Sequence, residues 1–193
     1  MLWKGKIVFV LLLVVICTAC SSGRDFVRPT DSSFVLGKTT IQEIRQHYGE
    51  PSREESVKAG ATGEPIKLLM YSYAFSRLRG LPTTVRVMSC FFHNDILVGY
   101  DYKSDFPEDN TNFDETKINR IIKGVSQERE IISLIGNPTG RDIYPLTDMN
   151  SKSLSYNYME SNAQLQIFSK FLLILLDKDG IVTDIKFVSN GRK

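Results

Sequence analysis

The sequence predicts an α+β fold of two tandem units, in each of which one or two helices precede three antiparallel strands and pack on one face of their sheet. Two observations predict this fold. A short helical pattern that ends in Gly-x-Pro occurs twice, and each copy is followed by three β-prone segments separated by turn residues. A third observation, an apolar segment near the start of the chain, indicates an exported protein.

The two helical segments, residues 37–51 and 124–138, share three residues at identical spacing. These are Gly37, Gly49 and Pro51 in the first segment and Gly124, Gly136 and Pro138 in the second. Thr39 followed by Gln42 has the spacing of a capping box, and Ser126 can cap the second helix. The second Gly of each segment suits a left-handed C-cap, and the Pro two residues later prevents the helix from continuing. We therefore expect one short helix in each segment.

Six β-prone segments follow, three after each helix. They are residues 68–75, 85–92 and 96–102 in the first unit and residues 154–159, 165–176 and 181–188 in the second. Asn94-Asp95 and Asp179-Gly180 suit tight turns between strands. A metal loop at Asp177 and Asp179 is the alternative, but the rest of a calcium-binding pattern is missing there. Isoleucines at helical spacing in residues 115–123 predict an additional helix at the start of the second unit.

Aromatic residues recur in the first strand of each unit. They are Tyr71, Tyr73 and Phe75 in the first unit, and Tyr156 and Tyr158 in the second. A spacing of two residues places such rings on one face of a sheet. Packing under the helices explains most of them, whereas exposed members would be natural anchors for a binding partner. We therefore treat these five residues as tentative binding residues.

The run of six apolar residues from Phe171 to Leu176 is the most apolar stretch after the N-terminal segment. It is too short to cross a bilayer as a helix. One interpretation is a central strand that is buried on both faces. The other is part of a surface that contacts a protein or lipid, and the sequence leaves both open.

The first 19 residues read as a signal peptide. Lys4 and Lys6 precede an unbroken apolar run over residues 7–16, and small residues lie just before Cys20. This pattern resembles the lipobox of bacterial lipoproteins, with Cys17 where Leu is usual, and the resemblance implies acyl chains on Cys20. Ordinary cleavage after Ala19, which would leave a free N-terminal Cys, is the alternative.

The remaining chain divides into a lipid-anchored tether over residues 20–33, a first unit over 34–103, a linker over 104–114 and a second unit over 115–190. Removal of Lys4 and Lys6 would leave 22 basic and 22 acidic groups. A nucleic-acid-binding protein usually has a strong basic excess, so we expect no nucleic-acid partner. The sequence does not predict the oligomeric state.

No pattern of catalytic or metal-binding residues stands out in the sequence. Cys90 would need a base to act as a nucleophile, and His47 and His93 are the only histidines. Once Cys17 is removed and Cys20 is lipidated, Cys90 has no partner for an internal disulfide. We therefore predict a protein that is not an enzyme and that binds no cofactor and no metal.

The duplicated helix with its Gly-x-Pro end and the aromatic strand at residues 71–75 resemble the SmpA/OmlA (BamE-like) family of outer-membrane lipoproteins. This resemblance implies a unit of two helices and three strands, here in tandem as in the β-lactamase inhibitor protein. It also implies a lipid anchor in the outer membrane with the chain facing the periplasm, and Ser21 after Cys20 resembles the sorting choice for that membrane.

Two functions follow from the resemblance as expectations. One is a membrane-anchored scaffold or accessory that binds an envelope protein, as in the machinery that assembles outer-membrane proteins. The other is an anchored inhibitor or ligand-binding module with a tandem inhibitor-like fold. Fold alone does not choose between them.

Overall fold

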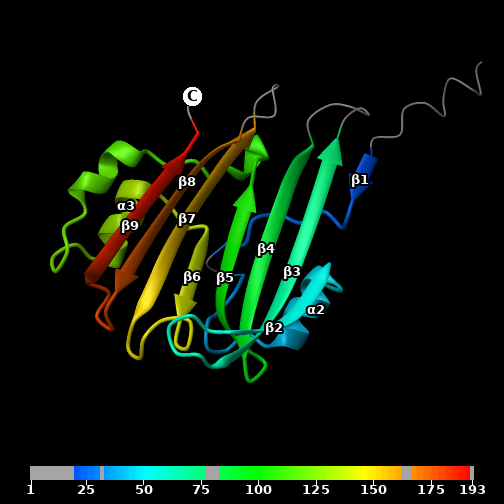
Figure 1. Cartoon of the computed structure of the whole chain (residues 1–193), viewed down its shortest axis with the longest axis horizontal. Coiled ribbons are helices and arrows are strands. Elements are labelled where there is room, and N and C mark those ends of the chain that lie inside the picture. Colours follow the sequence, from blue (N-terminus) through cyan, green and yellow to red (C-terminus); the bar gives the residue numbers. More distant parts are fainter. Residues whose placement is uncertain (1–19, 31–32, 77–82, 162–166, 192–193) are drawn as a thin grey trace, which may run out of the picture.

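The computed structural model describes residues 20–30, 33–76, 83–161 and 167–191, so the expected signal peptide lies outside the described residues. Its main feature is one sheet of nine strands in which all neighbours are antiparallel (Figure 1). The strands are β1 (Cys20–Ser22), β2 (Arg53–Lys58), β3 (Pro65–Ser76), β4 (Thr84–His93), β5 (Ile96–Ser104), β6 (Gly140–Ile143), β7 (Lys152–Ser161), β8 (Ile167–Leu176) and β9 (Val182–Asn190). Their order is β1-β3-β4-β5-β6-β7-β8-β9, and β2 pairs with β3 beside β1.

The helices are short. The two α-helices, α2 (Ile41–Tyr48) and α3 (Glu128–Ile135), have eight residues each. Two 3-10 helices, η1 (Pro107–Asp109) and η2 (Glu115–Arg120), lie between β5 and α3. The additional helix expected over residues 115–123 is therefore a 3-10 helix that ends at Arg120, and the backbone is extended at Ile121.

The predicted fold class, α+β with a helix-packed sheet in each unit, is wrong. The six expected strands do form, as β3, β4, β5, β7, β8 and β9, but they belong to one continuous sheet. The strand β6, which we did not predict, pairs with β5 on one side and β7 on the other. Because β6 satisfies the facing edges of both halves, the molecule is dominated by one sheet with few helical residues.

The expected turns form as the sequence indicates. Asn94 and Asp95 have positive φ angles of 51° and 60°, as a two-residue hairpin turn requires. In the second turn, the Asp177 carboxylate accepts hydrogen bonds from the backbone N–H groups of Asp179 and Ile181, both at 2.9 Å. Asp177 thus stabilises the turn itself, and the turn interpretation of this segment is confirmed.

Both α-helices begin one residue later than expected. The N-caps are Thr40 and Gln127, and the Glu three residues after each cap accepts the backbone N–H of the cap, at 2.7 and 2.9 Å. The expected caps, Thr39 and Ser126, instead accept the backbone N–H four residues before them, both at 2.9 Å. The capping residues therefore differ, but the same pair of contacts recurs in the two halves.

The glycines at the helix ends are required, although not as left-handed C-caps. Gly49 and Gly136 have φ angles of 84° and 102° with ψ angles of −160° and −175°. This region of the backbone map is essentially restricted to glycine. The backbone N–H groups of Gly37 and Gly124 donate to strands β5 and β9, both at 2.8 Å, so the repeat extends to the links between helix and sheet.

Two hydrophobic cores lie on the face of the sheet that carries α2 and α3. In the first, α2 packs on β3, β4 and β5, and in the second, α3 and η2 pack on β7, β8 and β9. A third, small cluster on the opposite face joins Ile66 and Val98 to Leu146. The face opposite the α-helices, here called the open face, is thus covered at one end by the loop that carries Leu146.

Candidate functional site

The open face runs without interruption across both halves of the molecule. One row of cross-strand neighbours consists of Met70, Ser89, Asp101, Gly140, Ser155, Leu173 and Lys186, from β3 to β9. Each residue of the row lies beside the next one because the register is continuous through β6. Among the described residues, no α-helix packs on this face. Met70, Ser89, Asp101, Leu173 and Lys186 keep part of this row in contact with solvent, whereas Gly140 and Ser155 at its centre are buried.

The centre of the open face is polar where β5, β6 and β7 meet. We call this group the seam; it consists of Asp101, Asp142, Ser153, Ser155 and Asn157. Asp101 Oδ1 accepts hydrogen bonds from Asn157 Nδ2 at 2.5 Å and from Ser155 Oγ at 3.2 Å. Asp142 Oδ2 accepts from Ser153 Oγ at 2.8 Å. These bonds hold the two carboxylates in fixed positions.

Two glycines give the seam its room. A side-chain carbon at Gly99 would collide with the Asp142 carboxylate and with Leu146. A side-chain carbon at Gly140 would collide with the Ser155 hydroxyl and would lie 2.5 Å from the backbone carbonyl oxygen of Tyr100. A side chain at Gly99 or Gly140 would therefore displace the polar side chains of the seam. Both positions require glycine, and the backbone itself forms the bottom of the seam.

Burial and a like charge act on Asp142. Burial raises the pKa of its carboxyl to about 6, the Ser153 hydrogen bond opposes this rise, and the nearby Asp101 charge adds to it. The Asp142 carboxylate is thus costly to ionise, whereas a quarter of the Asp101 side chain reaches solvent. Asp101 Oδ2 lies 3.4 Å from the exposed Lys103 Nζ, so Asp101 is the seam acceptor that a partner can reach.

An apolar surface flanks the seam on the side of the second half. We call Phe171, Leu173, Leu175 and Val188 the β8–β9 patch. Phe171 is 39% exposed and lies opposite Val188, which is 51% exposed. The alternate residues of β8 point to the helix side and are fully buried. The interpretation of the run 171–176 as a strand buried on both faces is therefore wrong, because its open-face residues contact solvent.

The aromatic residues proposed from sequence lie elsewhere. Tyr71 and Tyr156 are buried under the α-helices, and their hydroxyls donate to the carbonyls of Gly49 and Gly136, at 3.2 and 3.0 Å. Tyr73 is half-buried and stacks on a phenylalanine of the linker, and Tyr158 is half-buried beside Phe168. Phe75, also half-buried, lies where β1 pairs with β3. All five residues lie at the alternate strand positions that face the α-helices and not the open face. Their binding role stays a prediction.

The residues of the open face were missed because they lie between the aromatic ones. Ser153, Ser155 and Asn157 alternate with Leu154, Tyr156 and Tyr158 along β7. A strand with large apolar residues on one face and small polar residues on the other presents the polar face to something other than the core. This alternation was the available signal.

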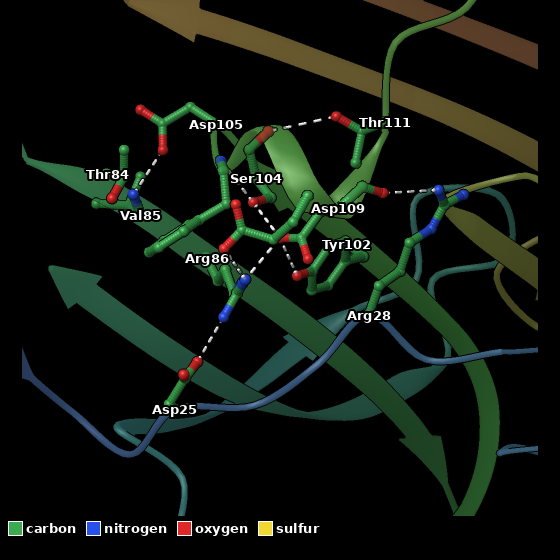
Figure 2. Close-up of polar contacts among 12 residues, drawn as sticks. Asp25, Arg28, Thr84, Val85, Arg86, Tyr102, Ser104, Asp105, Asp109 and Thr111 are labelled. Carbon is green, nitrogen blue, oxygen red and sulfur yellow. Dashed lines mark hydrogen bonds and ion pairs between the residues drawn. The ribbon is translucent and has the colours of Figure 1, made fainter.

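A second polar cluster lies at the other face, between β4, β5 and η1 (Figure 2). Arg86, only 6% exposed, forms ion pairs with Asp109 at 2.8 Å, Asp25 at 2.6 Å and Glu108 at 3.0 Å. Asp109 also accepts a hydrogen bond from the Tyr102 hydroxyl at 2.7 Å. One guanidinium thus binds three carboxylates, and these ion pairs hold the linker and the N-terminal segment against the sheet.

The side chains considered for catalysis or metal binding do not form a site. Cys90 is completely buried, and burial raises the pKa of its thiol, which disfavours the reactive thiolate. The His47 ring lies edge-on to Tyr48, and His93 Nδ1 lies 3.2 Å from the Pro65 carbonyl oxygen. In the ranges that the structure describes, no group of His, Cys, Asp and Glu is arranged to hold a metal, and no helix has the length and apolarity to cross a membrane.

Comparisons with known proteins add little to this geometry. No protein-family profile and no curated protein matches the chain, so the resemblance to the SmpA/OmlA family stays an expectation. A solved structure of a "putative beta-lactamase inhibitor protein" from Streptococcus mutans is similar to this chain. The likeness covers 95% of this chain and 96% of that one, with 13% identity and a TM-score of 0.44. At these values nothing about this chain is concluded from the likeness.

Proposed function

We propose that this chain is a membrane-anchored binding module that docks a partner protein on the open face of its sheet. The observation that carries this proposal is the continuous row of side chains across both halves, with an apolar patch exposed beside a fixed polar centre. Contiguous exposed apolar surface next to well-placed polar groups is typical of protein-interaction sites.

The anchor is the second part of the proposal. The positive start, the apolar run and the residues around Cys20 support cleavage before Cys20 and lipidation of its thiol, at an outer membrane with the chain facing the periplasm. A single acyl chain binds a membrane only marginally, whereas two or more anchor a protein stably. Proximity to the membrane would raise the local concentration of an envelope partner.

The geometry supports a partner of defined chemistry. The β8–β9 patch would lose its contact with water beneath an apolar surface of the partner, which favours association. Asp101, held by Ser155 and Asn157, would accept a hydrogen bond from an Arg, Lys or Tyr of the partner after Lys103 moves aside. Because Asp101 is fixed before binding, little side-chain entropy is lost there. If the partner is an enzyme, occupation of its surface would make this chain an inhibitor.

Matched substitutions on the two faces test the proposal. Val188 on the open face and Val125 on the helix side are 51% and 62% exposed, so Val188→Ala and Val125→Ala remove the same group from opposite faces. A photo-crosslinking residue placed at each position in cells that produce the protein identifies what each face contacts. The captured protein is then purified, and its affinity for each variant is measured by calorimetry.

We expect crosslinks to one protein from position 188 and none to that protein from position 125. With purified partner, Phe171→Ala, Val188→Ala and Asp101→Asn should each weaken binding by roughly tenfold, the effect typical of a residue at the centre of an interface, and Val125→Ala should not change it. Equal capture from both positions, or unchanged affinity in all three open-face variants, would show that the open face is not the docking surface.

A further inference from the structure

The segment that follows Cys20 is attached to the sheet from its first residue. β1 pairs with the end of β3, so that Cys20 lies opposite Ser76. Gly23 has a φ of 86°, and a side-chain carbon there would collide with the backbone carbonyl oxygen of Ser72. The chain therefore passes so close to β3 that glycine is required. Residues 20–33 were predicted to be a lipid-anchored tether, and the described part of this range begins with the edge strand β1.

Side chains fasten the next residues to the first half. The Asp25 carboxylate lies 2.6 Å from Arg86 Nη1, an ion pair that is visible in Figure 2. The Phe26 ring packs edge-on against Tyr48 and Tyr102, with both ring centroids at 6.2 Å. One charged contact and one apolar contact thus hold two adjacent residues, which is more than a freely moving tether would make.

Arg28 completes the attachment and extends it to the second half. Its guanidinium donates to the carbonyls of Asp109 and Asn110 in the linker, both at 3.3 Å. It also donates to the carbonyls of Asn137 and Pro138, which follow α3, at 2.8 and 3.0 Å. Figure 2 shows the Arg28 side chain extended towards the linker. The segment of residues 20–30, here called the strap, therefore bridges both halves on the helix side.

The strap places Cys20 at one end of the sheet. β3 ends and β4 begins at this end, and Ser161 of β7 pairs with Ile167 of β8 there, so it is also the end at which β9 finishes (Figure 1). The Asn94–Asp95 and Asp177–Gly180 turns lie at the opposite end. The two ends of β9 thus differ in their distance from Cys20 along the strand direction.

From this geometry we infer that the Cys20 end of the sheet sits directly on the lipid bilayer, with the strands rising from it. The inference rests on the proposed lipidation of Cys20. A free tether of 14 residues would have a mean end-to-end distance of about 20 Å. The strap instead holds Cys20 directly against the edge of the sheet. The open face then stands within about one strand length, roughly 30 Å, of the membrane surface. Its partner must present the bound surface in that layer, as a membrane protein does.

Energy transfer from a dye at the end of β9, or from a dye in the turn before β9, tests this arrangement. The lipidated protein carries a dye at Asn190→Cys or at Lys178→Cys, both exposed, while the native Cys90 stays buried. It is placed in vesicles of phosphatidylethanolamine and phosphatidylglycerol with acceptor dyes on the headgroups. Transfer from position 190 should exceed transfer from position 178 by roughly twofold or more, because β9 spans about 30 Å.

Release of the strap provides the second arm. The double substitution Asp25→Ala with Arg28→Ala removes the two polar side-chain attachments but leaves the pairing of β1 with β3, and Val27→Ala changes an exposed residue of the same strap as the control. The double variant should reduce the difference between positions 190 and 178, while Val27→Ala should keep it. Circular dichroism checks that the double variant is folded. If it is not folded, the comparison of positions 190 and 178 in the protein with the native strap still decides the test.

The outcomes separate the inference from the proposed anchor. If the mature protein carries no lipid by mass spectrometry, or if the Cys20→Ser form binds these vesicles as well as the native form does, the proposed anchor is wrong and the inference fails with it. If the lipidated protein binds the vesicles but the two positions give equal energy transfer, the proposed lipid anchor is retained. The inference that the Cys20 end of the sheet lies on the bilayer is then wrong.

Discussion

At the scale of single residues, Asp142 links the fold to the electrostatics of the open face. Its carboxyl lies between Ser153 and Asp101 over the glycine floor of the seam, and burial raises its pKa to about 6 from a reference of 3.8. Between these two pH values the folded chain retains a proton that the unfolded chain has released. The contribution of Asp142 to stability is therefore fully present below about pH 4 and is lost as the pH rises through about 6.

Asp142→Asn should remove this dependence. A shift of about two pKa units corresponds to roughly 3 kcal/mol, so the variant should gain up to that amount over the native chain between pH 4 and pH 8. Urea unfolding of both proteins across this range measures the difference. Asp148→Asn, an exposed position a few residues later in the chain, serves as the control and should follow the native profile. A constant difference between Asp142→Asn and the native chain at all pH values would contradict the buried-carboxyl explanation.

At the scale of elements, the repeat is strongest where each helix end meets its first long strand. Tyr71 donates to Gly49 O, and Tyr156 donates to Gly136 O, so one hydrogen bond locks the end of each α-helix to the sheet. Each glycine adopts a backbone conformation that directs its carbonyl to the hydroxyl. The Gly-x-Pro motif and the following tyrosine therefore form one structural unit, used twice.

Tyr71→Phe and Tyr156→Phe should each lower the free energy of unfolding by about 1 kcal/mol, because each leaves a part-buried carbonyl without its donor. The two effects should add in the double variant, since the sites lie in separate cores. Chemical denaturation measures all three proteins. Tyr73→Phe, whose ring stacks on Phe106, is the matched control and should change stability by less than about 0.5 kcal/mol. Destabilisation by only one of the two single substitutions would show that the hydrogen bonds of Tyr71 and Tyr156 do not contribute equally to stability.

The sequence predicted correctly those helices and turns that depend mainly on residues close to one another in the chain. Both α-helices follow from the spacing of their glycines and apolar residues, and the hairpin at Asn94-Asp95 follows from residues that tolerate positive φ. β6 could not be predicted, because Gly-Arg-Asp-Ile has neither alternation nor a β-prone composition. It forms only because two strand edges distant in the sequence need a common partner. The fold class was wrong for this reason, as one missing strand separated a single sheet into two.

The candidate site was predictable in part from the same alternation. Large apolar residues in β7 marked the face under the helices, and the small polar residues between them marked the other face. The pairing of Asp101 with Asn157 depends on β6 bringing β5 beside β7, which no local pattern reveals. The strap was hidden for a similar reason: Asp25 and Arg28 look like solvated tether residues until their partners, far away in the sequence, are placed beside them.

At the scale of the whole molecule, the continuous sheet predicts that both halves unfold together. β6 pairs with a strand of each half, Arg28 bridges the linker and the segment after α3, and the seam bonds Asp101 of one half to Asn157 of the other. Opening one core would break these connections and expose the edge of the remaining sheet. Independent units, in contrast, would unfold at separate denaturant concentrations.

Ile44 and Ile131 are equivalent residues in α2 and α3, and both are almost completely buried in their respective cores. Ile131→Ala should destabilise the second core by about 2–5 kcal/mol through the cavity it creates. In a single cooperative unit, hydrogen exchange in the most protected amides of β3 and β4 should accelerate as much as exchange in β7 and β8, although the first core is unchanged. Ile44→Ala, in the first core, should likewise accelerate hydrogen exchange in β7 and β8 as much as in β3 and β4. Acceleration confined to the mutated half in both variants would show that the sheet is continuous in hydrogen bonding but divided in stability.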